Sequence, residues 1–145
     1  MAKDKKPIAL KKGFFLLPQF TFSEIDSLRI KPNVIVIPFL SAVNSLHQDS
    51  FIINHYSAKV NLLSICDGSA TAVATGIFDG KPITDHTSDY AGIKAQFSRP
   101  IRKQNISVVD SGNLYSTAGV SNAVEGNLMV INKNPFTFKT RTGTF

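Results

Sequence analysis

The chain has 145 residues, of which 43% are hydrophobic and 18% are charged, and this composition suits one globular domain with a buried core. Its apolar runs fall short of the roughly 20 residues of a membrane span, and its amino terminus lacks the apolar core of a secretory signal. The formal net charge of +6 is concentrated at the two ends, with no nucleic-acid-binding motif beside it. We therefore expect a single cytoplasmic domain over residues 1–145, without a membrane segment and without direct contact to nucleic acid.

The first half of the chain predicts a strand, a helix and a second strand. Residues 21–28 indicate a short acidic turn or helix. Residues 32–40 are continuously apolar and β-branched, which is typical of a central strand buried on both faces of a parallel sheet. The mixed pattern of residues 41–56 predicts a loop and a covering helix, and the apolar character returns in a strand over residues 59–66.

Small residues dominate the next segment, SATAVATG, and predict a closely packed helix over residues 68–76. Gly76 suits its carboxyl-terminal cap. Residues 78–81 carry a turn signal, FDGK. A second helix is expected over residues 88–97, where Asp89 fits the first turn.

A hairpin and a last helix complete the predicted elements. Residues 106–109 and the segment LYSTAG are joined by the turn formers DSGN, which favours a tight hairpin. Ser121 and Asn122 can cap a helix over residues 123–131. Residues 132–145 have no regular period and predict an irregular tail.

Cys66 is the single cysteine, so the chain has no internal disulfide and no CxxC pair. Such a residue is either a small buried hydrophobe or a reactive thiol. Cys66 ends an apolar strand and precedes a small-residue helix, which is the pattern of a nucleophile elbow. At that position, free backbone N–H groups and the helix dipole stabilise a thiolate or a developing oxyanion.

Motifs along most of the chain resemble the ThiJ/PfpI superfamily of glutamine amidotransferase-like domains. LLSICDGSATAVATGIFDGKPITDH is similar to the family core, in which an elbow cysteine, a small-residue helix, a GLLDG turn and a histidine follow one another. KPNVIVIP is similar to its PDVLVVPGG strand, and DSGNLYSTAGVSNAVEGNLMVI to its hairpin and closing helix. The resemblance covers about residues 13–131, after a basic lead over residues 1–12. It implies an α/β, flavodoxin-like three-layer sandwich with a mostly parallel sheet.

The resemblance also implies roles for individual residues. Cys66 would be the nucleophile, His86 its partner, and the backbone N–H of Asp67 an oxyanion donor. His86 follows Cys66 by 20 residues, as in the family, although a structural histidine stays open as an alternative. The Asp67 carboxylate would oppose thiolate formation beside the thiol, or satisfy free N–H groups as a helix-entry residue, and the second role is commoner.

Three departures from the family pattern weaken the case for catalysis. Phe39 and Leu40 replace the family's glycine pair, so their side chains can fill the pocket or block the second oxyanion donor. Nothing before Lys11 resembles the family's opening strand and helix with its acidic residue, and the tail is short, as in a fragment of a larger protein. The missing strand predicts an open sheet edge. Either the segment FFLLPQF or a second copy would cover it, so we expect a homo-oligomer.

Two functions stay open for this sequence. The first is a bacterial ligand-sensing or regulatory domain with little turnover, similar to those of AraC-type regulators and membrane-tethered relatives. The second is a cysteine-dependent hydrolase or hydratase, similar to isonitrile hydratase or an amidotransferase, acting on a small molecule. The sequence favours the sensing or regulatory function. We expect no metal, because His47, His55 and His86 are scattered and Asp85 completes no motif, and no cofactor, because phosphate and dinucleotide fingerprints are missing.

Overall fold

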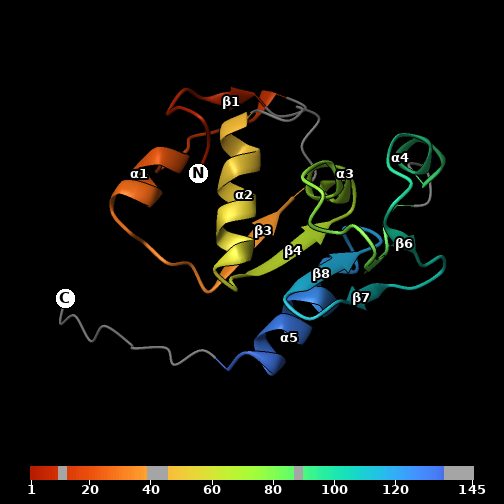
Figure 1. The fold of residues 1–145 in the computed structure, drawn as a ribbon. Helices are drawn as coiled ribbons and strands as arrows, with labels where there is room; N and C mark the ends of the chain where they lie inside the picture. Colours follow the sequence, from red (N-terminus) through yellow and green to blue (C-terminus); the bar gives the residue numbers. More distant parts are fainter. Residues whose placement is uncertain (10–12, 39–45, 87–89, 136–145) are drawn as a thin grey trace.

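A four-stranded sheet lies at the centre of the computed structural model, which describes residues 1–9, 13–38, 46–86 and 90–135 (Figure 1). Its strand order is β3–β4–β8–β7. β3 (Val34–Ile37), β4 (Asn61–Ile65) and β8 (Leu114–Thr117) run parallel, and β7 (Val108–Asp110) pairs with β8 in the antiparallel direction. The predicted α/β class with a mostly parallel sheet is confirmed.

Helices cover both faces of this sheet. α2 (Leu46–Ser57) and α3 (Gly68–Ala74) lie on one face, and α5 (Ala123–Lys133) lies on the other (Figure 1). Successive side chains of a strand point to opposite faces, so Leu62 of β4 enters the first core and Leu63 enters the second. Both are essentially inaccessible to solvent.

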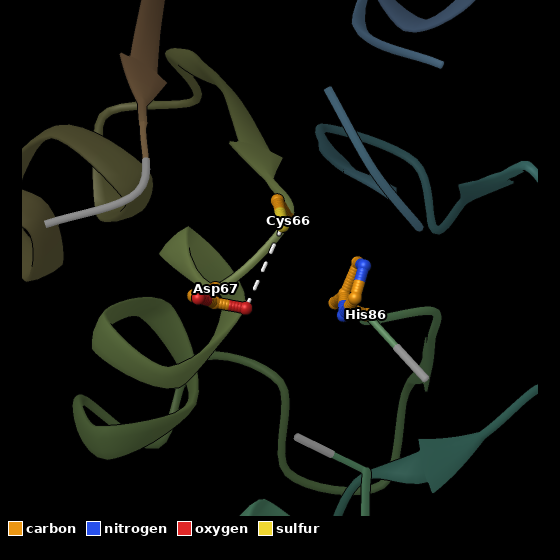
Figure 2. Close-up of side chains that lie close together, drawn as sticks. All are labelled: Cys66, Asp67 and His86. Atoms are coloured by element: carbon orange, nitrogen blue, oxygen red, sulfur yellow. Dashed lines mark hydrogen bonds between the residues drawn. The ribbon is translucent and has the colours of Figure 1, made fainter. Parts of the chain in front are cut away.

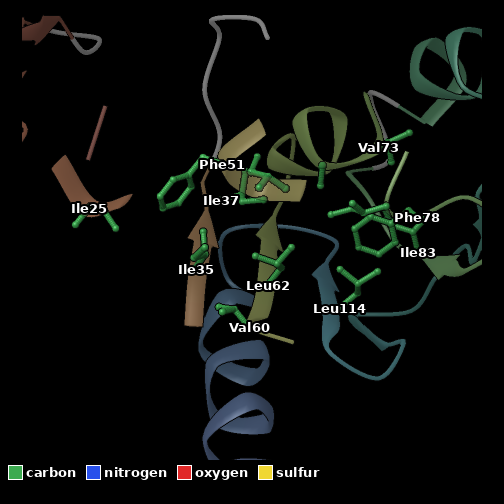
Figure 3. Close-up of a cluster of buried hydrophobic side chains, with 13 residues drawn as sticks. Ile25, Ile35, Ile37, Phe51, Val60, Leu62, Val73, Phe78, Ile83 and Leu114 are labelled. Carbon is green, nitrogen blue, oxygen red and sulfur yellow. The ribbon is translucent and has the colours of Figure 1, made fainter. Parts of the chain in front are cut away.

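The first core is the larger and holds the three amino-terminal helices on the sheet (Figure 3). Its buried members are Ile25, Ile35, Ile37, Phe51, Ile52, Val60, Leu62, Ala72, Val73, Ile77, Phe78, Ile83 and Leu114. The second core joins Leu63 and Tyr115 of the sheet to Val130 of α5. Each apolar side chain of this size contributes about 1.5–3 kcal/mol when fully buried, so the two cores are the main stabilising term.

The acidic segment predicted as a turn or a helix forms a helix, α1 (Phe22–Ser27). A capping box starts it, because the Thr21 hydroxyl accepts a hydrogen bond from the Glu24 N–H while the Glu24 carboxylate accepts one from the Thr21 N–H. Hydrogen bonds from the Lys5 ammonium, 2.6 Å away, and from Thr21 hold the pKa of Glu24 below its usual value. This contact ties the basic lead to α1.

Four short strands and one helix complete the described elements. β1 (Ile8–Ala9) pairs antiparallel with β2 (Phe15–Leu16), and β5 (Pro82–Ile83) pairs in parallel with β6 (Ile101–Arg102). Two-residue strands have no periodicity to read, so the sequence did not predict them. α4 (Tyr90–Gln96) matches the helix expected over residues 88–97, while Asp89 lies outside the described residues.

The prediction of a central β3 is wrong, and one of the two alternatives for covering the open sheet edge is not found among the described residues. β3 is an edge strand of the described sheet, since its one described partner is β4, and Val36 is 40% exposed. Its unbroken apolar run was typical of a strand with neighbours on both sides. The segment FFLLPQF does not cover this edge, because β2 pairs with β1 and the Phe15 side chain is 66% exposed.

The remaining predicted elements agree with the structure except at their ends. Gly76 has the left-handed φ of +79° expected of a helix cap, and the hairpin of β7 and β8 is present. Asn122 is the N-cap of α5, but its side chain makes no capping hydrogen bond. Part of the predicted tail, residues 136–145, lies outside the described residues. In the part of the chain that the structure covers, no helix has the length and apolar character to cross a bilayer.

Gly68 sets the distance between α3 and the end of β3. A Cβ atom at this position would lie 2.1 Å from the carbonyl oxygen of Ile37 and 2.9 Å from that of Pro38. Both neighbours are backbone atoms, which cannot rotate away as a side chain can. α3 can therefore begin directly after Asp67 only because residue 68 has no side chain.

We predict that Gly68→Ala lowers the free energy of unfolding by about 1–3 kcal/mol or more, because the added methyl group overpacks the contact with β3. Urea denaturation followed by circular dichroism measures this change. Gly92→Ala in α4 is the matched control, since a Cβ there meets no atom within 4 Å and alanine is the better helix former. Equal destabilisation by the two substitutions would contradict the close approach.

Candidate functional site

Cys66 occupies the turn between β4 and α3, at the carboxyl edge of the parallel strands. Its φ of +54° lies in the left-handed region, which costs a non-glycine residue about 1–2 kcal/mol. Hydrogen bonds hold this backbone on both sides: the Cys66 N–H donates to the Thr117 carbonyl, and the Cys66 carbonyl accepts from the Ser69 N–H, each at 3.1 Å. The packing of β4, β8 and α3 thus maintains a strained backbone at the thiol.

Asp67 and His86 bring their side chains to the thiol (Figure 2). The Cys66 Sγ atom, a carboxylate oxygen of Asp67 and a ring nitrogen of His86 all lie within 4.8 Å of one another. The thiol donates a hydrogen bond to Asp67 Oδ1 at 3.5 Å. All three residues are half-buried, so solvent and small molecules reach them. Such a group can transfer a proton, and its donors can also hold a metal ion.

The position of Asp67 corrects one expectation. Its backbone is the N-cap of α3, but its side chain makes no capping hydrogen bond. The carboxylate points to the Cys66 thiol instead (Figure 2). The commoner role of a helix-entry aspartate is therefore wrong here, because the left-handed turn at Cys66 aims the side chain at the sulfur. The oxyanion role of the Asp67 N–H stays a prediction.

His86 is positioned by the two buried residues before it. The Thr84 N–H donates to the Ser116 hydroxyl at 2.9 Å, and the Thr84 hydroxyl donates to the Ile106 carbonyl at 2.8 Å. These bonds fasten the end of β5 beside β8. Gly119 lies close to the ring, since a Cβ there would be 3.9 Å from His86 Cδ2. His86 therefore stands over the carboxyl edge of the sheet although it belongs to no strand of that sheet.

A buried ion pair between Arg102 of β6 and Asp85 stabilises the segment that precedes His86. Arg102 Nε lies 3.5 Å from Asp85 Oδ2, and the two side chains are 4% and 1% exposed. None of the guanidinium nitrogens has a hydrogen-bond partner among the described residues, so the ionic attraction is the interaction that offsets the burial of Arg102. The sequence indicated Asp85 only as a possible metal ligand. The local sequence does not indicate that Arg102 is buried in an ion pair, because its partner Asp85 lies 17 residues earlier.

Other predicted site residues do not join this group. His55 is a buried helix residue, whose Nδ1 hydrogen-bonds the Phe51 carbonyl at 2.9 Å. Phe39 and Leu40, the expected pocket residues, lie outside the described residues, as does the side chain of His47. The roles given to them stay predictions.

A hollow of about 400 Å³ adjoins the site without including Cys66 or His86. Asp85 links the two, because it lines the hollow and directly precedes His86. The loop after β6 forms most of the wall, a feature that sequence patterns did not indicate. The lining residues are Thr84, Asp85, Lys103, Gln104, Asn105, Ile106, Ser107, Ala118 and Asn122.

A curated sequence relative supports the predicted resemblance. The chain is 27% identical over 127 residues to the isonitrile hydratase of Pseudomonas putida, an alignment that includes 85% of this chain and 53% of the relative. The chain thus spans about half the length of that protein. No family model matches the chain.

Solved structures agree with the fold. A ThiJ/PfpI domain protein from Brachyspira murdochii superposes with a TM-score of 0.72 at 16% identity, covering 93% of this chain and 78% of that one. The chain has the ThiJ/PfpI fold. An AraC family transcriptional regulator from Pseudomonas putida gives a TM-score of 0.72 at 14% identity, covering 90% of this chain and 70% of that one. The fold that the resemblance implied is therefore confirmed.

We predict that Arg102→Met destabilises the fold by about 3–5 kcal/mol, because it leaves the Asp85 carboxylate without its buried ionic partner. Thermal unfolding at neutral pH measures the loss. Arg99→Met is the matched control, since the Arg99 side chain is 79% exposed in its pair with Asp79. An exposed pair contributes about 0–1 kcal/mol, so similar losses in the two variants would contradict the structural importance of Arg102.

Proposed function

We propose that this domain performs cysteine-dependent chemistry on a small electrophilic molecule, as a hydratase or hydrolase with Cys66 as the nucleophile. The observation that supports this most directly is the left-handed backbone of Cys66 beside His86 and Asp67. A merely structural cysteine gains nothing from a strained turn, whereas a nucleophile gains exposure and fixed orientation. The similarity to isonitrile hydratase suggests a nitrile-like, isonitrile-like or carbonyl-like substrate.

In the proposed reaction, His86 accepts the proton of the Cys66 thiol, and the thiolate then forms a bond to the electrophilic carbon. His86 returns the proton to the substrate, at the nitrogen of a nitrile, the oxygen of a carbonyl or the carbon of an isonitrile. Water subsequently adds to the carbon, the carbon–sulfur bond breaks, and the thiol is restored. The Asp67 carboxylate disfavours a lone thiolate, so the positive charge on His86 must offset it. The thiol must also stay reduced, which fits the expected cytoplasmic location.

A sensing domain is the second candidate. It rests on the fold shared with the AraC family regulator, and on Phe39 and Leu40, which replace the glycine pair of the ThiJ/PfpI pattern that this sequence resembles. A sensor would bind its small molecule beside Cys66 and release it unchanged. Product formation, as opposed to saturable binding without product, distinguishes the two functions.

We predict that the chain converts small nitriles to amides or small isonitriles to formamides, and that Cys66→Ala abolishes this turnover. His86→Gln is expected to lower kcat by about 10²–10⁴-fold, because it removes the group that transfers the proton. Product detection by NMR checks both results, with Asp26→Asn, an exposed carboxylate far from the thiol in sequence, as the control. Undiminished turnover in Cys66→Ala would contradict the proposal, while binding without product would favour the sensor.

We further propose that the chain self-associates. β3 leaves one edge without a described partner strand, and α5 carries a row of exposed apolar side chains. Val124, Leu128 and Ile131 are 67%, 55% and 42% exposed, and their spacing of four and three residues puts them on one side of the helix. Apolar rows of this kind mark surfaces that gain stability from a partner.

We expect light scattering over a concentration series to detect a dimer or larger species, and Leu128→Glu to shift it toward monomer. Leu28→Glu is the matched control, because Leu28 is a 62% exposed leucine at the end of α1. A monomer at every concentration would refute self-association. Equal dissociation by both variants would refute the assignment to α5.

A further inference from the structure

We propose that Cys66, Asp67 and His86 form a binding site for Zn²⁺, with a fourth coordination position open to water. This inference goes beyond the proposed function and does not depend on it, because a zinc ion can bind these side chains whether or not Cys66 turns a substrate over. It also reverses the sequence-based expectation of no metal. That expectation rested on the spacing of the histidines and on Asp85, and it left out the carboxylate of Asp67 next to Cys66.

The distances suit one small ion. Zinc bonds of about 2.3 Å to sulfur and about 2.0–2.2 Å to nitrogen or oxygen put tetrahedral ligand atoms about 3.5 Å apart. Cys66 Sγ and Asp67 Oδ1 are already separated by 3.5 Å. The whole group lies within 4.8 Å, so the His86 ring needs to approach by only about 1 Å to complete the set (Figure 2).

The donor types select the metal. A thiolate, a carboxylate and an imidazole are all ordinary zinc ligands, whereas Ca²⁺ and Mg²⁺ prefer oxygen ligands alone. The thiolate and the carboxylate together carry two negative charges, which balance the ion. Three protein ligands and a free fourth position are the arrangement of an open zinc site.

Zinc would also relieve the conflict between the thiol and the carboxylate. In the structure, the thiol proton lies between Cys66 Sγ and Asp67 Oδ1. Loss of that proton alone would bring two negative charges together at 3.5 Å. A zinc ion takes the proton's place, and the proton passes to solvent. The adjacent positions of the two ligands, fixed by the strained turn, reduce the entropy cost of binding.

Among the described residues, no other group of three His, Cys, Asp or Glu side chains meets this spacing. All three members are half-buried, so the ion can enter from solvent. A zinc-bound Cys66 thiolate would share its electron pair with the metal. Zinc would therefore protect Cys66 from electrophiles and suppress the proposed thiol chemistry.

The test uses the full chain with Co²⁺ as a spectroscopic substitute for Zn²⁺. We expect one equivalent of Co²⁺ to produce a thiolate-to-cobalt charge-transfer band, which added Zn²⁺ removes. Zn²⁺ should also slow the alkylation of Cys66 by iodoacetamide, and EDTA should restore it. Cys66→Ala should lack the charge-transfer band. Asp67→Asn, whose neutral amide is a weaker ligand, should bind more than about 10-fold less tightly while its thiol still reacts.

Asp26→Asn is the control and should bind like the unmodified chain, because Asp26 is an exposed carboxylate outside the group. The absence of the band in the folded unmodified chain would overturn the zinc site. Equal weakening by Asp67→Asn and Asp26→Asn would overturn it too. Hydration of isonitriles by a chain that binds no zinc would contradict only the zinc site. Zinc binding by a chain without turnover would contradict only the proposed function.

Discussion

The contact of Gly68 with the carbonyl oxygens of Ile37 and Pro38 is the constraint on which the site depends. It allows α3 to begin one residue after Asp67, so the chain must reverse direction within Cys66 and Asp67. The left-handed φ of Cys66 is the consequence. The same packing holds the thiol and the carboxylate side by side, because neither backbone can relax without separating α3 from β3.

Much of the fold could be predicted because its central elements carry local signals. The apolar runs of β3 and β4, the small residues of α3 and the turn formers between β7 and β8 each indicated the element that forms. Local sequence signals could not predict that β3 is an edge strand. An unbroken apolar strand is typical of the middle of a sheet, and only the pairing of distant segments decides which strand has two neighbours.

The candidate site was predictable in part. The positions of Cys66 and His86 followed from the resemblance to the ThiJ/PfpI core, which also set the correct fold. The direction of the Asp67 side chain did not follow, since the commonest role of an aspartate at a helix start is to cap it. The buried pair of Asp85 and Arg102 was also invisible, because it depends on β5 lying beside β6. Side-chain direction and pairing between short strands are properties of the assembled tertiary structure.

The hydrogen bond from the Cys66 N–H to the Thr117 carbonyl links the reactive turn to a strand that is synthesised 51 residues later. Pairing over such a separation carries a loop-closure cost and comes late in folding compared with helix formation. The elbow therefore acquires its final geometry only once β8 has added to β4. A chain in which β8 is not paired with β4 lacks this bond, so the strained geometry of Cys66 depends on a long-range contact as well as on its own turn.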